Sequence, residues 1–144
     1  MTDGFIERIE RSFNTLAPRG EELVDRFYAN LFAKNPGVRP MFPANMGEQK
    51  KKLLGSLVLV VRNLRSSDKL REALMQMGAR HVEYGTKPEH YPIVRDTLLD
   101  VMGQVAGDAW SEQLASDWKT AIDFVSEVML EGQRQVVDAA SNAG

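Results

Sequence analysis

Apolar side chains recur along the chain at spacings of three and four residues, which places them on one face of an α-helix. The first stripe runs through Phe5, Ile9, Phe13 and Leu16. No segment alternates apolar and polar residues around a tight turn, as a β-hairpin would. The pattern predicts an all-α protein of about six long helices. The stripes fill residues 5–16, 21–32, 47–64, 68–84, 88–106 and 108–133.

Glycine and proline separate these stripes. The segment "NPGVRPMFP" at 35–43 can form only a short helical turn, because its three prolines interrupt a long helix. Gly85 suits a left-handed helix end, and Pro88 suits the first turn of the next helix. Asp108, after Gly107, is expected to cap the last helix. The small, polar residues 134–144 are expected to fray.

Composition fits one globular domain over residues 1–144, with 43% hydrophobic and 26% charged residues. The net charge of −2 indicates neither a nucleic-acid nor a membrane partner. The absence of cysteine excludes disulfides and thiolate metal sites. The apolar run at 53–61 is too short to span a bilayer, and the N-terminus lacks a signal-peptide core. We expect a cytoplasmic protein.

His81 falls on the apolar face of its helix, in line with Leu74 and Met77. A core histidine can simply pair with a carbonyl or a carboxylate. As a metal ligand it has no second histidine three or four residues away, because His90 lies beyond Gly85 in another helix, so a zinc site is disfavoured. A single imidazole suits haem, whose porphyrin supplies four of the iron's ligands.

Three other residues raise the same question. Tyr28 lies on an apolar stripe, Gln49 lies four residues before Leu53 at the start of another, and Phe42 stands between Met41 and Pro43. Taken singly, they fit a core tyrosine, a surface glutamine and a core anchor.

Together these residues belong to segments that resemble the globins, and among them the bacterial single-domain globins similar to the haem domain of flavohaemoglobins. The resemblance covers nearly the whole chain in order and implies a globin fold. It rests on "RFYANLF" at 26–32, "NPGVRPMFP" at 35–43, "GEQKKKLLGSL" at 47–57, "ARHVEYGTKPEHYPIV" at 79–94 and "DWKTAIDFVSEVM" at 117–129.

The resemblance implies a role for each residue around one haem b. His81 would be the proximal ligand of the iron, and Tyr28 and Gln49 the distal, catalytic pair at its open site. A phenol hydroxyl and an amide can donate hydrogen bonds to oxygen that gains negative charge. The remaining cofactor-binding roles fall to Phe42 stacking on the porphyrin, Leu53 and Leu57 lining the gas site, and Lys52 at a propionate. Pro36 would open the short C helix.

The proximal side departs from the flavohaemoglobin pattern. Tyr91 matches the tyrosine near the proximal histidine, but Gln133 stands where a glutamate is expected, and Glu131 is two residues earlier. The carbonyl of Met77 is the expected acceptor for His81. A neutral glutamine would push less electron density to iron, which disfavours peroxidase-like chemistry.

The resemblance implies reversible binding of dioxygen, with nitric oxide and carbon monoxide as further ligands. It also implies oxidation of nitric oxide to nitrate, supported by a separate reductase since the chain has no GxGxxG motif. The alternatives are a non-enzymatic oxygen carrier or gas sensor, and a haem-free globin fold used as an interaction module. Binding of Gln49, Lys52 or Tyr28 to the iron stays open. We expect a monomer or weak homodimer.

Overall fold

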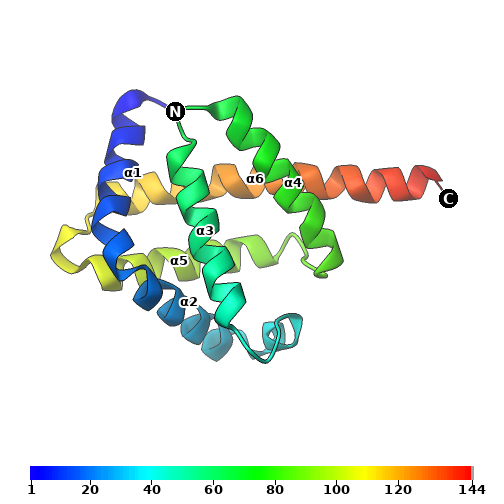
Figure 1. Cartoon of the computed structure of the whole chain (residues 1–144), viewed down its shortest axis with the longest axis horizontal. Coiled ribbons are helices and arrows are strands. Elements are labelled where there is room, and N and C mark those ends of the chain that lie inside the picture. The colour runs from blue at the N-terminus through cyan, green and yellow to red at the C-terminus, as the bar shows by residue number, and fades with distance from the viewer. Residues whose placement is uncertain (144) are drawn as a thin grey trace.

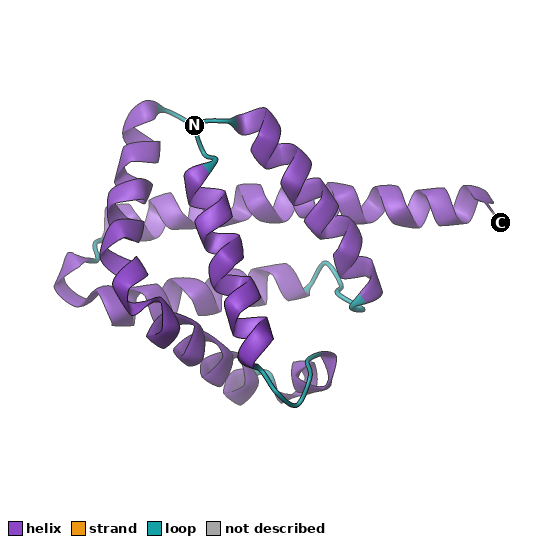
Figure 2. Cartoon of the chain, viewed as in Figure 1, coloured by secondary structure: helices purple, strands orange, loops and turns teal. Residues whose placement is uncertain are grey.

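The computed structural model describes the backbone of residues 1–143 and the side chains of residues 1–141. This part of the chain contains helices and loops but no strand, so the prediction of an all-α protein is confirmed (Figure 2). The short helical turn predicted within residues 35–43 is present as a 3₁₀ helix at 36–41. In chain order the elements are α1 (Asp3–Leu16), η1 (Ala17–Arg19), α2 (Gly20–Lys34), η2 (Pro36–Met41), α3 (Gly47–Arg62), α4 (Ser67–Glu83), α5 (His90–Ala106), η3 (Gly107–Ala109) and α6 (Glu112–Ala143).

The helices cross one another around a single core. The long helix α6 runs behind α4 and α1, and α5 packs on α2 and on α6 (Figure 1). The predicted apolar stripes supply the core, because Ile9 and Leu16 of α1 and Phe27 of α2 are almost fully buried. The other side chains buried to the same extent are Leu23, Leu70, Leu74, Met102, Val101, Trp118 and Val128.

Helices α4 and α6 make the closest helix contact in the described chain, and two glycines permit it. A Cβ atom on Gly78 would lie 1.9 Å from the carbonyl oxygen of Met129. A Cβ atom on Gly132 would lie 2.1 Å from the carbonyl oxygen of Met75. Any side chain at either position would force the two backbones apart.

The end of α4 is a Schellman motif centred on Gly85, as the left-handed end predicted there requires. Gly85 has φ 76°, and its N–H donates to the carbonyl of Val82 at 3.1 Å. The N–H of Thr86 donates to the carbonyl of His81 at 3.2 Å. The chain therefore reverses direction within five residues of His81, and its exit path is fixed by these bonds.

Two predicted helix starts are wrong by a few residues. Helix α5 begins at His90 rather than at Pro88, because the N–H of Lys87 is held by Nδ1 of His90 and the intervening residues form a turn. Helix α6 begins at Glu112, where the hydroxyl of Ser111 accepts from the N–H of Leu114. Asp108, the predicted cap, lies in η3.

Helix α6 continues past the body of the molecule towards the C-terminus (Figure 1). The side chains of residues 134–141 are exposed. Fraying of residues 134–144 concerns motion and stays a prediction, and Gly144 lies outside the described residues. Within residues 1–143, no helix is both long and apolar enough to span a membrane.

The glycine contact predicts that Gly78→Ala destabilises the fold by about 3 kcal/mol, because the added methyl group meets backbone that cannot rotate away. Urea denaturation followed by circular dichroism measures the change. Gly55→Ala is the matched control: it lies at an exposed position of α3, its Cβ would meet nothing within 4 Å, and it should stabilise the fold by about 0.5 kcal/mol. Equal stabilities for the two variants would contradict the close α4–α6 contact.

Candidate haem site

His81 is a half-buried side chain on the last turns of α4. Its Nδ1–H donates to the carbonyl of Met77 at 2.6 Å, as predicted. Burial lowers the pKa of His81, and the charge of Arg80 lowers it further, while the bond to Met77 opposes both. The ring is therefore a neutral imidazole at pH 7, with its lone pair on Nε2. A metal ligand needs that arrangement.

Tyr28 on α2 and Gln49 on α3 meet across the helix interface. The amide Nε2 of Gln49 donates to the hydroxyl of Tyr28 at 3.1 Å, and Tyr28 is only 4% exposed. Burial raises the pKa of Tyr28, and the bond from Gln49 opposes the shift. The phenol is thus neutral at pH 7, and its own proton is not used by Gln49. That proton is available to a third group.

Phe42 packs beside this pair in an aromatic cluster. Its ring centroid lies 5.6 Å from that of Tyr28 and 5.4 Å from that of Phe32, both in edge-to-face geometry. The rings of Tyr28 and Phe32 are 5.8 Å apart. Edge-to-face pairs at these distances are favourable beyond their buried area. The predicted neighbours from α2 and from the segment after η2 therefore come together.

Gln133 of α6 is 9% exposed and joins α5 to the turn that follows α4. Its Oε1 accepts from the hydroxyl of Tyr91 at 2.8 Å, and its Nε2 donates to the carbonyl of Thr86. Glu131 instead pairs with Arg71 on the surface. Burial raises the pKa of Tyr91 to about 12, so the linked groups are uncharged at pH 7. Gln133, not Glu131, thus occupies the position beside Tyr91.

The other predicted site residues differ in how far they are buried. Leu57 is buried, whereas Leu53 is half-buried and Lys52 is exposed. Within the described residues Lys52 has no carboxylate partner, although its neighbours Lys50 and Lys51 pair with Asp25 and Glu48. Lys52 therefore keeps its cationic group free in solvent, as a propionate contact would need, and nothing else fixes its position.

The residues present fit a haem between α3 and α4. These consecutive helices do not pack closely along their lengths within the described chain. Each leaves apolar side chains only partly buried, Leu53 and Val58 on α3 and Met77 and Val82 on α4. Nε2 of His81 has no hydrogen-bond partner among the described residues. A flat apolar group with one coordination site matches partly buried apolar side chains on two helices and one free imidazole nitrogen.

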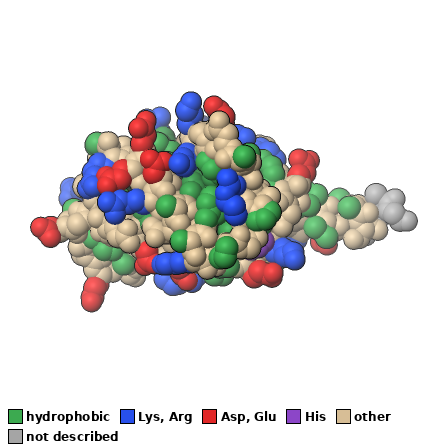
Figure 3. Space-filling view, turned by 90° about the horizontal axis from the view of Figure 1, so that it is seen from below, with side chains coloured by type: hydrophobic (Ala, Val, Ile, Leu, Met, Phe, Trp, Pro, Cys, Tyr) green, Lys and Arg blue, Asp and Glu red, His purple; other side chains and the backbone are tan. Residues whose placement is uncertain are grey.

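Figure 3 shows hydrophobic side chains gathered near the centre of the lower face, with Lys and Arg side chains beside them. That distribution suits a group that is apolar over most of its area and anionic at one edge.

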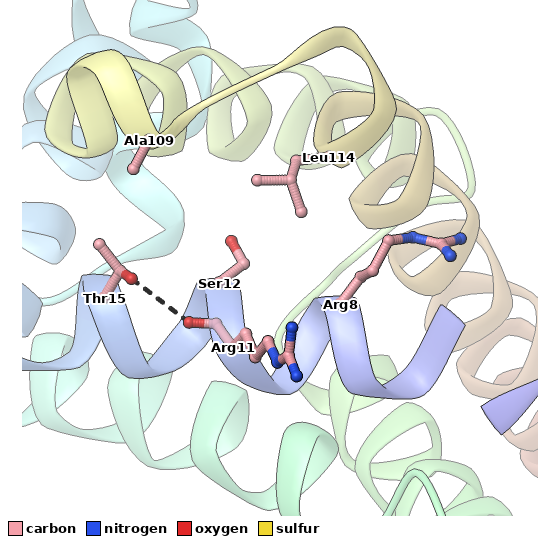
Figure 4. A pocket seen from close by; sticks show the side chains of 6 residues that line it. All are labelled: Arg8, Arg11, Ser12, Thr15, Ala109 and Leu114. Carbon is pink, nitrogen blue, oxygen red and sulfur yellow. Dashed lines mark hydrogen bonds between the residues drawn. The ribbon is translucent and has the colours of Figure 1, made fainter. Parts of the chain in front are cut away.

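Two surface pockets lie away from this site. One, of about 240 Å³, is lined by Arg8, Arg11, Ser12, Thr15, Ala109 and Leu114 (Figure 4). Its arginines are already paired, Arg8 with Asp117 and Arg11 with Glu7. The second pocket lies against the start of α2, with Leu54 as its α3 wall. Neither contains a predicted site residue.

Sequence reasoning did not identify two residues that shape the site. Thr86 contributes only its backbone carbonyl, so its side chain type carries no signal. Arg39 lies in a proline-rich segment and donates to the carbonyls of three following residues. Only the folded path of the loop reveals these contacts.

Comparison with known proteins gives a consistent result. The family model described as Globin matches residues 25–129. A bacterial globin from Campylobacter jejuni superposes with a TM-score of 0.84 at 27% identity, covering 95% of this chain and 99% of that chain. An uncharacterized globin-like protein of Aquifex aeolicus is 26% identical over 136 residues, which cover 94% of this chain and 96% of the relative.

A flavohemoprotein of Halalkalibacterium halodurans is 27% identical over 131 residues. The match covers 89% of this chain and 32% of the relative. The chain therefore spans about a third of the length of this flavohemoprotein, and the likeness concerns only that part.

The buried bridge at Gln133 predicts that Gln133→Leu destabilises the protein by about 2 kcal/mol, because the hydroxyl of Tyr91 and the carbonyl of Thr86 both lose their partner. Denaturant titration of the haem-free protein measures this. Gln135→Leu, at an exposed position two residues on, should stay within about 0.5 kcal/mol of the parent. A Gln133→Leu variant as stable as its control would refute the bridge.

Proposed function

Because the chain belongs to the globin family, we propose that it binds one haem b between α3 and α4, with His81 as the proximal ligand. When bound, the haem supplies an iron with one open coordination position for a diatomic gas. We further propose that the protein binds dioxygen reversibly there and oxidises nitric oxide to nitrate. A reductase outside residues 1–144 would provide the electrons.

The observation that carries this proposal is the direction of the Tyr28–Gln49 hydrogen bond. Gln49 donates to the hydroxyl oxygen of Tyr28, so the phenol proton points elsewhere. A buried, neutral donor is suited to a ligand that gains negative charge on binding, because the hydrogen bond strengthens as the charge develops. Tyr28 would retain dioxygen, and Gln49 would hold Tyr28 in that orientation.

The apolar side chains have a separate task. Phe42 would stack on the porphyrin, and Leu53 and Leu57 would keep water from the gas site. Exclusion of water slows loss of the ligand in an ionic form, because a separated anion is poorly stabilised in an apolar site. Lys52 would extend from α3 to a propionate in solvent.

The proximal side favours reversible binding over peroxidase-like chemistry. The N–H of His81 is bonded to the neutral carbonyl of Met77, and the Gln133–Tyr91 pair carries no charge at pH 7. Among the described residues no carboxylate accepts the proton of the imidazole, so the ring would be a moderate electron donor to iron. This same feature keeps a non-enzymatic oxygen carrier as the second candidate.

Tyr28→Phe tests the distal assignment. Loss of the hydroxyl should raise the dioxygen dissociation rate about tenfold to a hundredfold, the equivalent of one hydrogen bond to a charged acceptor. Stopped-flow displacement of dioxygen by carbon monoxide measures the rate. Tyr84→Phe removes a hydroxyl from an exposed tyrosine and should leave it unchanged. An unaltered rate in Tyr28→Phe would mean that Tyr28 does not contact the ligand.

Turnover of nitric oxide separates the enzyme from the carrier. After reconstitution with hemin, the protein should show an intense Soret band, and the reduced form should give a carbonmonoxy spectrum typical of histidine-ligated haem. With NADH, a reductase and dioxygen present, we expect nitrate to accumulate over many turnovers. Formation of only one equivalent of nitrate per haem would favour the carrier. In the spectroscopic experiment, an unchanged spectrum in His81→Leu would refute the assignment of His81 as the iron ligand.

A further inference from the structure

Arg39 donates three hydrogen bonds to main-chain carbonyls. This half-buried residue lies in η2, and its guanidinium reaches the loop that joins η2 to α3. Its Nη1 donates to the carbonyls of Phe42 at 3.2 Å and Pro43 at 3.0 Å. Its Nη2 donates to the carbonyl of Ala44 at 3.2 Å. One planar fork thus holds three consecutive carbonyls of a loop without regular structure.

The same guanidinium also covers the aromatic cluster. Its central carbon lies 4.9 Å from the centroid of the Phe32 ring, within the range of a cation–π contact. Phe32 in turn contacts Phe42 and Tyr28. Arg39 therefore joins the cluster on α2 to the backbone of the loop that carries Phe42.

The loop decides where the distal residues stand. At the end of the loop, Oδ1 of Asn45 accepts from the N–H of Gly47, the first residue of α3, at 3.0 Å. Gln49 follows within the first turn of α3 and donates to Tyr28. Between Phe42 and Asn45, no other side chain of the described residues bonds to the loop carbonyls.

We propose that Arg39 is a positioning residue for the distal site: it holds the loop at 42–44 so that Phe42 and Gln49 keep Tyr28 in its ligand-binding orientation. The inference rests on the proposed gas-binding function of Tyr28. A lysine cannot replace Arg39, because one ammonium group does not span three carbonyls in a plane. The carbonyls of the exposed Pro43 and Ala44 can bond to water instead, so the effect falls on loop order rather than on global stability.

The first test uses the haem-free protein. Hydrogen exchange followed by mass spectrometry should show faster exchange, by about tenfold, across residues 41–49 in Arg39→Met and Arg39→Lys. Arg62→Met is the matched control, because it removes an exposed arginine from the far end of α3 for which no side-chain contact is found among the described residues. Exchange across 41–49 that equals the control would overturn the proposal.

The second test asks whether Arg39 acts through Tyr28. In the carbonmonoxy form, the C–O stretching frequency of Arg39→Met should shift towards that of Tyr28→Phe, and its dioxygen dissociation rate should rise about fivefold. Neither change should occur when Arg39→Met is added to Tyr28→Phe. Equal effects with and without the tyrosine hydroxyl would show that Arg39 contacts the haem or ligand by another route, and would overturn the proposal.

The two failures can be told apart. If Tyr28→Phe alone leaves the dissociation rate unchanged, the proposed function of Tyr28 fails, whatever the exchange data show. If Tyr28→Phe raises the rate and Arg39→Met does not, the proposed function stands and the role of Arg39 is wrong.

Discussion

The backbone contact between α4 and α6 is the constraint on which the rest of the site depends. At Gly78 and Gly132 the helices approach so closely that a single methyl group would overlap a carbonyl. His81 lies one turn after Gly78, and Gln133 follows Gly132 directly, so the contact fixes the positions of the proposed iron ligand and of Gln133. The bond from Gln133 to the carbonyl of Thr86 then ties α6 to the turn that ends α4.

The distal side is built in a different way. Helix α3 does not pack closely on α4, and its start is reached through a loop rather than through a helix crossing. Side-chain contacts therefore fix the position of this part of the site, whereas a backbone contact between helices does so near His81. Asn45 accepts from the first N–H of α3, the aromatic rings of α2 contact Phe42, and Arg39 donates to the loop carbonyls.

Neutrality is the common electrostatic feature of the site. Burial lowers the pKa of His81 and raises the pKa values of Tyr28 and Tyr91, in each case away from the charged form. Glu131 and Lys50 are paired with Arg71 and Asp25. A site of neutral donors and one neutral imidazole is suited to binding a small uncharged gas and to stabilising charge only when it develops on the ligand.

The sequence by itself determined the helices and supplied the proposal for most side chains of the site. Apolar periodicity predicted the all-α fold, and Gly85 predicted the end of α4, because both depend on local geometry. The bond from His81 to Met77 was also predictable, since it spans one helical turn. The helix starts were harder to predict, because Ser111 competes with Asp108 as a cap and the turn before His90 depends on its ring nitrogen.

Only the tertiary structure decided that Gln133 rather than Glu131 faces Tyr91, and that Arg39 holds the loop after η2. Tyr91 and Gln133 lie on different helices, so the helix crossing sets their distance. The carbonyls that Arg39 reaches are near it in sequence, but only the folded path of the loop turns them towards its guanidinium.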